Sequence, residues 1–176
     1  MPQRLAAMAA GMLRDGEMSE PVARAAEIAD PMLRALAEAE RAAARGEVPI
    51  GAVLVDGASG LVLAASGNRV EELHDPTAHA EMLVLRAAAA AGAAPRLPAA
   101  DLYVTLEPCP MCAQAISFAR LRRVYFGAYD PKGGGVDHGP RIFQQPTCHH
   151  RPEVYGGIRE TAAAELLQRF FRDRRV

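Results

Sequence analysis

The chain has 176 residues, half of them hydrophobic, which excludes a disordered protein and suits a single domain with a buried core. A formal net charge of −1 excludes polyanion binding by overall charge, so any nucleic-acid surface must be a local patch. No apolar run approaches the roughly 20 residues that cross a bilayer, and the N-terminus lacks the apolar centre of a secretory signal. Three cysteines, two of them in C-x-x-C, do not make a disulfide framework. We therefore expect a cytoplasmic protein without membrane contact.

The first part of the chain divides into an extension and a helix. Residues 1–29 are rich in alanine, methionine and arginine, and we expect a loosely ordered N-terminal extension there. No repeat or low-complexity linker divides residues 30–176, which we interpret as one domain. Asp30-Pro31 is typical of an N-cap followed by proline at the first helical position, and Gly46 is expected to end this helix.

The rest of the domain alternates strands with helices. Hydrophobic runs and turn signals predict strands at 51–55, 61–66, 101–107, 124–128 and 152–158. Cap and proline signals with helical periodicity predict helices at 75–91, 108–120 and 161–171. Asp56-Gly57 favours a hairpin between the first two strands, and three glycines place a loop at 130–138. This alternation indicates an α/β layered fold.

A split motif carries the chemistry: His79-Ala80-Glu81, then Cys109-Pro110-Met111-Cys112. One histidine and two cysteines are a suitable zinc set, and three protein ligands leave a fourth position for water, as in catalytic sites. Cys109 and Cys112 are three residues apart at a predicted helix start, so both sulfurs share a face where the helix dipole favours thiolates. A buried or redox C-x-x-C pair is the structural alternative.

His79 and Glu81 are two residues apart, which on a helix places them on roughly opposite faces. First-turn side chains tilt toward the N-terminus, so with a helix start at Asp75-Pro76 both reach a site beyond the helix end. The sequence therefore predicts two helices whose N-termini point at one zinc. Glu81 would then carry the proton of the zinc-bound water to a ring nitrogen and to the departing amine. A core histidine beside a solvent-facing glutamate is the alternative.

The combination H-x-E with P-C-x-x-C is the signature of zinc deaminases. Residues from about 30 to 176 resemble the bacterial tRNA adenosine deaminase family, which converts wobble adenosine (position 34) to inosine. The matching stretches are 46–55, 67–69, 75–81, 102–112, 124–128, 130–132, 150–151 and 166–172. The resemblance implies a three-layer α/β/α cytidine deaminase-like fold, with a five-stranded mixed sheet sandwiched by helices. It also implies one Zn²⁺ per subunit, and a homodimer with active sites near the subunit interface.

The same resemblance assigns the substrate-binding residues, with the tRNA anticodon stem-loop as partner. The flipped base is expected to contact Asn68, the main chain at His79 and Ala80, and the Pro49 region. Loop residues Asp130 and Lys132 approach the nucleic-acid backbone, and the terminal helix with Phe170, Phe171 and Arg174 lines the path of the anticodon loop. Basic groups interleaved with aromatic rings suit single-stranded loops, although a basic last turn also complements a helix dipole.

Two segments depart from the commonest family pattern: Gly133-Gly134-Gly135 after Lys132, and Cys148-His149-His150. Both lie where the protein is expected to contact RNA, outside the zinc motif, so the choice of tRNA does not follow from the resemblance. The second segment also offers an alternative metal site, although three adjacent residues rarely converge on one ion. Two other functions remain open: a deaminase of free cytosine, guanine or a nucleoside, and a non-catalytic zinc-bound RNA-binding subunit.

Overall fold

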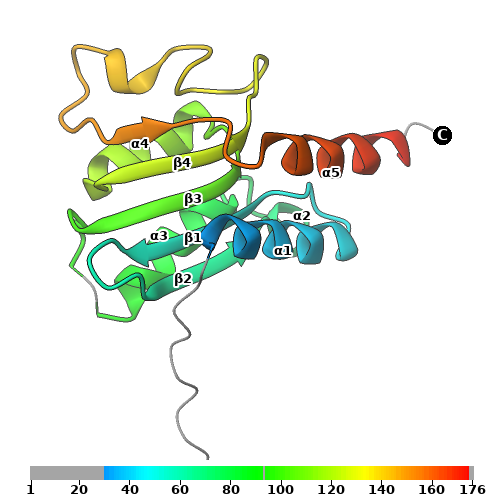
Figure 1. Ribbon diagram of the computed structural model, residues 1–176, viewed down its shortest axis with the longest axis horizontal. Helices are drawn as coiled ribbons and strands as arrows, with labels where there is room; N and C mark the ends of the chain where they lie inside the picture. The colour runs from blue at the N-terminus through cyan, green and yellow to red at the C-terminus, as the bar shows by residue number, and fades with distance from the viewer. Residues whose placement is uncertain (1–29, 93, 175–176) are drawn as a thin grey trace, which may run out of the picture.

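The computed structural model describes residues 30–92 and 94–174, and the extension expected at 1–29 lies outside them. Five strands form one sheet (Figure 1). They are β1 (Gly51–Asp56), β2 (Val62–Gly67), β3 (Ala100–Leu106), β4 (Arg123–Ala128) and β5 (Glu153–Tyr155). Their order is β2-β1-β3-β4-β5, with β1 antiparallel to both neighbours and β3, β4 and β5 parallel. The expected five-stranded mixed sheet is confirmed.

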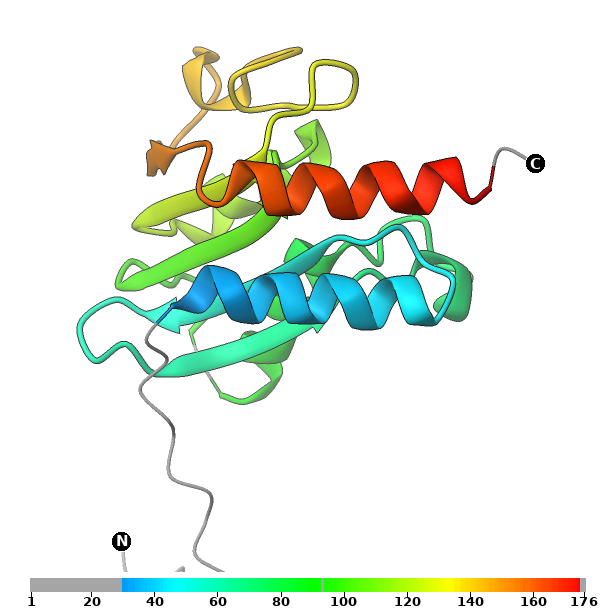
Figure 2. The ribbon, with the colours of Figure 1, turned by 45° about the vertical axis from the view of Figure 1, so that its right-hand side comes forward.

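Helices cover both faces of the sheet. They are α1 (Pro31–Ala44), α2 (Val70–Leu73), α3 (Ala80–Ala90), α4 (Pro110–Ala119), the 3₁₀ turn η1 (Ile142–Gln144) and α5 (Glu160–Arg172). Helices α1 and α5 lie side by side on one face (Figure 2), and α3 and α4 lie on the other. The three-layer α/β/α architecture is therefore confirmed. No helix in the described ranges is long and apolar enough to cross a bilayer.

The alternation of side chains along β1 explains why both faces are covered. Leu54 packs on one side with residues of α3 and α4, including Val84 and Ile116. Val53 and Val55 point to the other side and pack with Met32 of α1. Since successive side chains of a strand point to opposite faces, a strand that is apolar throughout needs a helical layer on each side. Both apolar clusters are buried, so the sheet lies at the centre of the domain.

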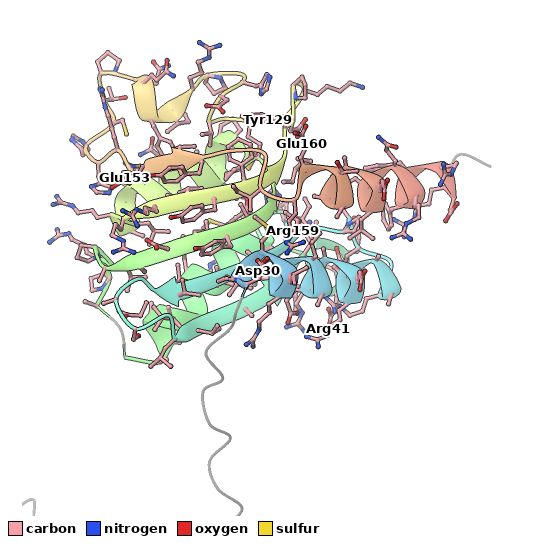
Figure 3. All side chains as sticks on the ribbon, in the orientation of Figure 1. Asp30, Arg41, Tyr129, Glu153, Arg159 and Glu160 are labelled. Carbon is pink, nitrogen blue, oxygen red and sulfur yellow. The ribbon has the colours of Figure 1, made fainter. Side chains whose placement is uncertain are left out.

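Helix α1 begins where the sequence predicts. The Asp30 Oδ1 accepts hydrogen bonds from the N–H groups of Met32 at 2.9 Å and Leu33 at 3.2 Å, and Pro31 occupies the first turn. The Asp30 Oδ2 also pairs with Arg159 at 2.6 Å, just before α5 (Figure 3). One carboxylate thus caps α1 and ties it to α5.

The predicted starts of α3 and α4 are wrong by a few residues. Helix α3 begins at Ala80 rather than near Pro76, because the Asp75 side chain accepts from the Thr77 N–H at 2.8 Å and from its hydroxyl. A short polar side chain that binds nearby backbone competes with helix formation. Helix α4 begins at Pro110 instead of Pro108. The helices predicted from the sequence did not include the short elements α2 and η1.

Candidate metal centre and adjoining pocket

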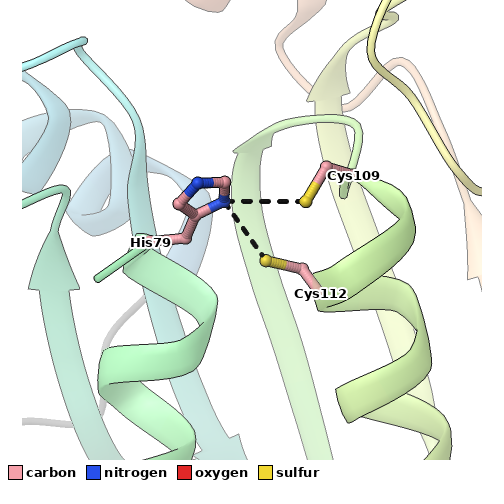
Figure 4. Close-up of side chains that lie close together, drawn as sticks. All are labelled: His79, Cys109 and Cys112. Atoms are coloured by element: carbon pink, nitrogen blue, oxygen red, sulfur yellow. Dashed lines mark hydrogen bonds between the residues drawn. The ribbon is translucent and has the colours of Figure 1, made fainter. Parts of the chain in front are cut away.

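Three metal-binding side chains meet between the N-termini of α3 and α4 (Figure 4). His79 is the N-cap of α3, Cys109 is the N-cap of α4, and Cys112 lies in the first turn of α4. The His79 Nδ1 lies 3.6 Å from the Cys109 Sγ and 3.5 Å from the Cys112 Sγ. The structure therefore brings together the three residues that the sequence singled out, at two helix N-termini.

These separations fit a zinc ion. Tetrahedral zinc with ordinary Zn–S and Zn–N bonds places nitrogen and sulfur ligands about 3.6 Å apart. The three ligand atoms lie within 4.8 Å of one another, and one histidine nitrogen faces both sulfurs. Both the donor types and their spacing are those of a three-ligand zinc site that leaves one position for water.

The electrostatics of the cysteine pair also favour a cation. The hydrogen bond from Cys112, followed by the one from His79, lowers the pKa of Cys109 to about 4. Donation to Cys109, together with burial, raises the pKa of Cys112. The opposite directions of the two shifts mean that a second negative charge beside the first is unfavourable without a cation. A divalent cation removes that penalty and allows both thiolates to form.

Glu81 is the second residue of α3 and is only 3 % exposed. Its Oε2 is the single buried side-chain oxygen or nitrogen in the described ranges that has no hydrogen-bond partner. Burial raises the pKa of this carboxyl. Buried polar atoms in native proteins are rarely left unpaired, so an unpartnered carboxylate oxygen beside a metal centre indicates a role in chemistry.

A cavity of about 940 Å³ opens beside His79, at the carboxyl ends of β3 and β4. Its wall includes four of the expected substrate residues: Asn68, Asp130, Lys132 and Arg174. Pro49, Ala80 and Phe170 are not part of the wall. Of the two phenylalanines expected here, Phe171 lines the wall and Phe170 does not; the Arg174 guanidinium lies 3.9 Å from the centre of the Phe170 ring. The pocket therefore joins residues from distant parts of the chain.

Asn68 links the pocket to the start of α3. Its Oδ1 accepts the Ala80 N–H at 3.0 Å, and its side chain is nearly buried. An N–H must face an oxygen, so this bond fixes the orientation of the amide and turns the NH₂ group the other way. That NH₂ group donates to no residue in the described part of the chain. Asn68 lines the pocket, so this group is a donor available to a ligand there.

The Cys148-His149-His150 segment does not assemble a second metal site. The His150 ring bonds the Leu121 carbonyl at 2.6 Å, and the Cys148 thiol donates to the His150 carbonyl at 3.1 Å. Across residues 30–92 and 94–174, His79, Cys109 and Cys112 are the one group whose ligand atoms converge. The alternative metal site proposed from sequence is not supported.

Glu107 was not identified from the sequence as a residue of this region. Glu107 is 2 % exposed and accepts hydrogen bonds from several backbone N–H groups of the loop at 130–138. Burial opposes ionisation, but the N–H groups of His138 and Asp130 outweigh it and hold the pKa of Glu107 below its usual value. A sequence signal for Glu107 was present: it directly follows the apolar run of β3, and a charged side chain at the end of a buried strand needs hydrogen-bond partners.

The comparisons with known proteins agree with this geometry. The family model described as the cytidine and deoxycytidylate deaminase zinc-binding region matches residues 26–128. The tRNA-specific adenosine deaminase of Agrobacterium fabrum is 62% identical over 142 residues, covering 81% of this chain and 92% of that protein. The tRNA-specific adenosine deaminase of Bacillus subtilis is 45% identical over 144 residues, covering 82% and 88%.

A solved structure extends the likeness to three dimensions. It comes from biochemical and structural studies of A-to-I editing by tRNA:A34 deaminases at the wobble position of transfer RNA. Its chain is 62% identical to this one, with a TM-score of 0.74 over 78% of this chain and 98% of that chain. The family model covers more than half of the chain, and the curated relatives match most of it. The chain therefore belongs to the tRNA-specific adenosine deaminases, within the cytidine and deoxycytidylate deaminase family.

Proposed function

We propose that this protein deaminates adenosine to inosine at the wobble position, position 34, of tRNA, with one zinc ion per subunit. The observation that carries the proposal is the position of the Glu81 carboxyl, whose Oε2 has no hydrogen-bond partner, beside three side chains spaced for tetrahedral zinc. In this proposal the ligands are His79, Cys109 and Cys112. The similarity to tRNA-specific adenosine deaminases along four-fifths of the chain supports the choice of substrate.

The chemistry assigned to Glu81 is proton transfer. His79, Cys109 and Cys112 would hold a zinc ion, which would supply a water with a pKa lowered toward neutrality. Glu81 takes one proton from the attacking water and gives it to the ring nitrogen next to the amino-bearing carbon. A second transfer, to the amino group, lets ammonia leave while the ring carbon becomes a carbonyl. Water and adenosine thus give inosine and ammonia, and Glu81 ends in its starting state.

The pocket suits a single base flipped out of an anticodon loop. Deaminases of nucleic acids draw the target base into a pocket and read it by hydrogen bonds and stacking. In this proposal the Asn68 NH₂ group binds the base, while Pro49 and the Ala80 main chain, which lie outside the pocket wall, contact the base only through movement of the neighbouring segments. Lys132 and Arg174 attract the phosphates of the anticodon stem-loop. Asp130 shapes the protein loop that carries Lys132, and the Phe170 ring packs against the Arg174 guanidinium.

We also propose a homodimer in the cytoplasm. Phe118 is 64 % exposed and borders an apolar groove of about 450 Å³ formed with Leu85, Leu97 and Ala115, on the outer side of α3 and α4. A large exposed aromatic ring on an apolar groove is typical of a protein interface. Sedimentation of the purified protein tests the dimer: a mass near twice 18.8 kDa supports it, and a monomer at micromolar concentration contradicts it.

The proposed cytoplasmic location rests on the cysteines. A reducing compartment keeps Cys109 and Cys112 available for zinc.

A matched pair of proteins tests the function. Wild type and Glu81→Gln are assayed on tRNA transcripts and on free cytosine and guanine, with inosine read by sequencing and zinc measured by metal analysis. Wild type should form inosine at position 34 only, and Glu81→Gln should keep its zinc but lose at least roughly a hundred-fold in rate. Turnover of free bases with unmodified tRNA would favour the alternative of a free-base deaminase. Residual activity near wild type in Glu81→Gln would remove the proton-transfer role.

A further inference from the structure

One buried carboxylate holds both ends of the loop at residues 130–138, which we call the pocket loop. The Glu107 Oε1 accepts the backbone N–H groups of Val136, Asp137 and His138 at 3.2, 2.9 and 2.9 Å. The other oxygen, Oε2, accepts the Asp130 N–H at 3.0 Å and lies 2.7 Å from the His138 Nδ1. The first and last residues of the pocket loop are therefore bound to the same side chain.

Two glycines of the pocket loop, Gly134 and Gly135, explain how the loop comes so close. A Cβ on Gly134 would collide with the Glu107 carboxylate, and a Cβ on Gly135 would lie 2.6 Å from the Pro110 nitrogen. The Gly135 N–H also donates to the Pro108 carbonyl at 2.8 Å. Side chains at 134 and 135 would push the loop away from the start of α4, so glycine is required for this contact.

Asp130 extends the arrangement to the pocket wall. With its own N–H bound to Glu107, it accepts the backbone N–H groups of Lys132 at 3.1 Å and Gly133 at 3.0 Å. This turn sets the direction of Lys132, and both Asp130 and Lys132 line the pocket. Hydrogen bonds thus run from Glu107, which precedes the proposed zinc ligand Cys109 by two residues, through Asp130 to the backbone N–H of Lys132, whose residue lines the pocket.

We propose that Glu107 is a positioning residue for tRNA binding, which fixes the pocket loop and thereby Lys132 at a set place relative to the metal centre. The inference rests on the proposed function for its substrate. Glu107 is not part of the pocket wall and is not one of the converging metal ligands. Its loss should therefore weaken tRNA binding, while the chemical step and the zinc content stay near wild type.

Glu107→Gln is the direct test, because the amide keeps the size of the side chain and one acceptor oxygen. Its NH₂ group cannot accept the Asp130 N–H, which is left without a partner. We expect KM for tRNA to rise by roughly ten-fold, the scale of one buried N–H group losing its acceptor. The value of kcat should change by less than about three-fold. Hydrogen exchange of the pocket-loop amides, measured without substrate, should become faster.

Two controls separate positioning from general loss of stability. Asp101→Asn neutralises another buried carboxylate, which pairs with Arg122 at 2.7 Å near the opposite end of β3. This variant should leave KM for tRNA and hydrogen exchange of the pocket loop unchanged. His138→Asn retains a side-chain donor toward Glu107 and should disturb the loop less than His138→Leu.

The outcomes are distinct. Wild-type KM and wild-type loop exchange in Glu107→Gln would overturn the inference, as would an equal rise in KM in Asp101→Asn. If the wild-type protein does not act on tRNA, the proposed function fails and the role in tRNA binding fails with it. Hydrogen exchange then still decides whether Glu107 holds the loop.

Discussion

Substitutions at Asn68 should separate its two hydrogen-bonding groups. Its Oδ1 accepts the buried N–H of Ala80 at 3.0 Å, and its NH₂ group donates to no residue in the described part of the chain, although Asn68 lines the pocket. Asn68→Asp keeps an oxygen facing Ala80 but replaces the NH₂ donor by an acceptor. Asn68→Ala removes both groups. The two variants share the loss of the donor and differ in the bond to α3.

The structure gives the size of each effect. In Asn68→Ala the Ala80 N–H loses its acceptor at a buried position, which costs about 1–3 kcal/mol of unfolding free energy. In Asn68→Asp the acceptor remains, and the N-terminus of α3 favours a negative charge by about 0.3–1 kcal/mol, which offsets part of the cost of burying it. Both variants lose the donor to the base, so kcat/KM should fall by roughly ten- to a hundred-fold in each.

Urea unfolding followed by circular dichroism, in parallel with wobble inosine formation on a tRNA transcript, measures both quantities. We expect Asn68→Ala to be less stable than Asn68→Asp, with both impaired in activity. Wild-type kcat/KM in Asn68→Asp would refute the assignment of the NH₂ group to the base. Unchanged stability in Asn68→Ala would show that the bond to Ala80 contributes nothing.

Two further predictions concern the metal and the start of α1. Cys109→Ser should reduce the zinc content far below one per chain, because a serine hydroxyl is a poor zinc ligand, and full zinc in metal analysis would remove Cys109 from the ligand set. Asp30→Ala should lower the unfolding free energy by about 1–2 kcal/mol through loss of the cap, whereas Asp30→Asn, which retains a capping oxygen, should lose less. Burial alone would raise the pKa of Asp30, but Arg159 and the Leu33 N–H outweigh it and hold the pKa below 3.8. A carboxyl whose pKa is lower in the folded than in the unfolded protein stabilises the fold most above the unfolded pKa. The Asp30→Ala deficit in urea unfolding should therefore be largest at pH 7 and shrink as the pH falls below 3.8, where protonation removes the charge but leaves an oxygen that can still cap the helix.

Local signals predicted those features of the fold that depend on neighbouring residues. Asp30-Pro31 marked the start of α1 because a cap and a proline act within one turn. Apolar runs marked all five strands to within a few residues. The same kind of signal failed at Asp75-Pro76, where Asp75 binds Thr77 in a turn before the helix. A sequence pattern shows that a cap residue is present, but not whether a helix or a turn uses it.

The substrate side of the site was less predictable. The expected Asn68, Lys132 and Arg174 line one pocket. Of the two expected phenylalanines, Phe171 lines it and Phe170, under the guanidinium of Arg174, does not. Which of two adjacent aromatic residues faces the pocket depends on the rotation and packing of α5. Glu107 was missed because its partners follow 23 to 31 residues later in the chain, beyond the reach of local patterns.

The sequence by itself determined the chemical groups of this protein: a histidine, a nearby carboxylate and two cysteines one helical turn apart. These groups act through residue type and local spacing, so the pattern sufficed to predict the zinc chemistry. The pattern also predicted that two helix N-termini point at one zinc. Only the tertiary structure decided that Asn68, Lys132 and Arg174 line one pocket beside them, and that Glu107 holds the pocket loop. Both depend on strand pairing and on hydrogen bonds between distant segments, which form only when the layers pack together.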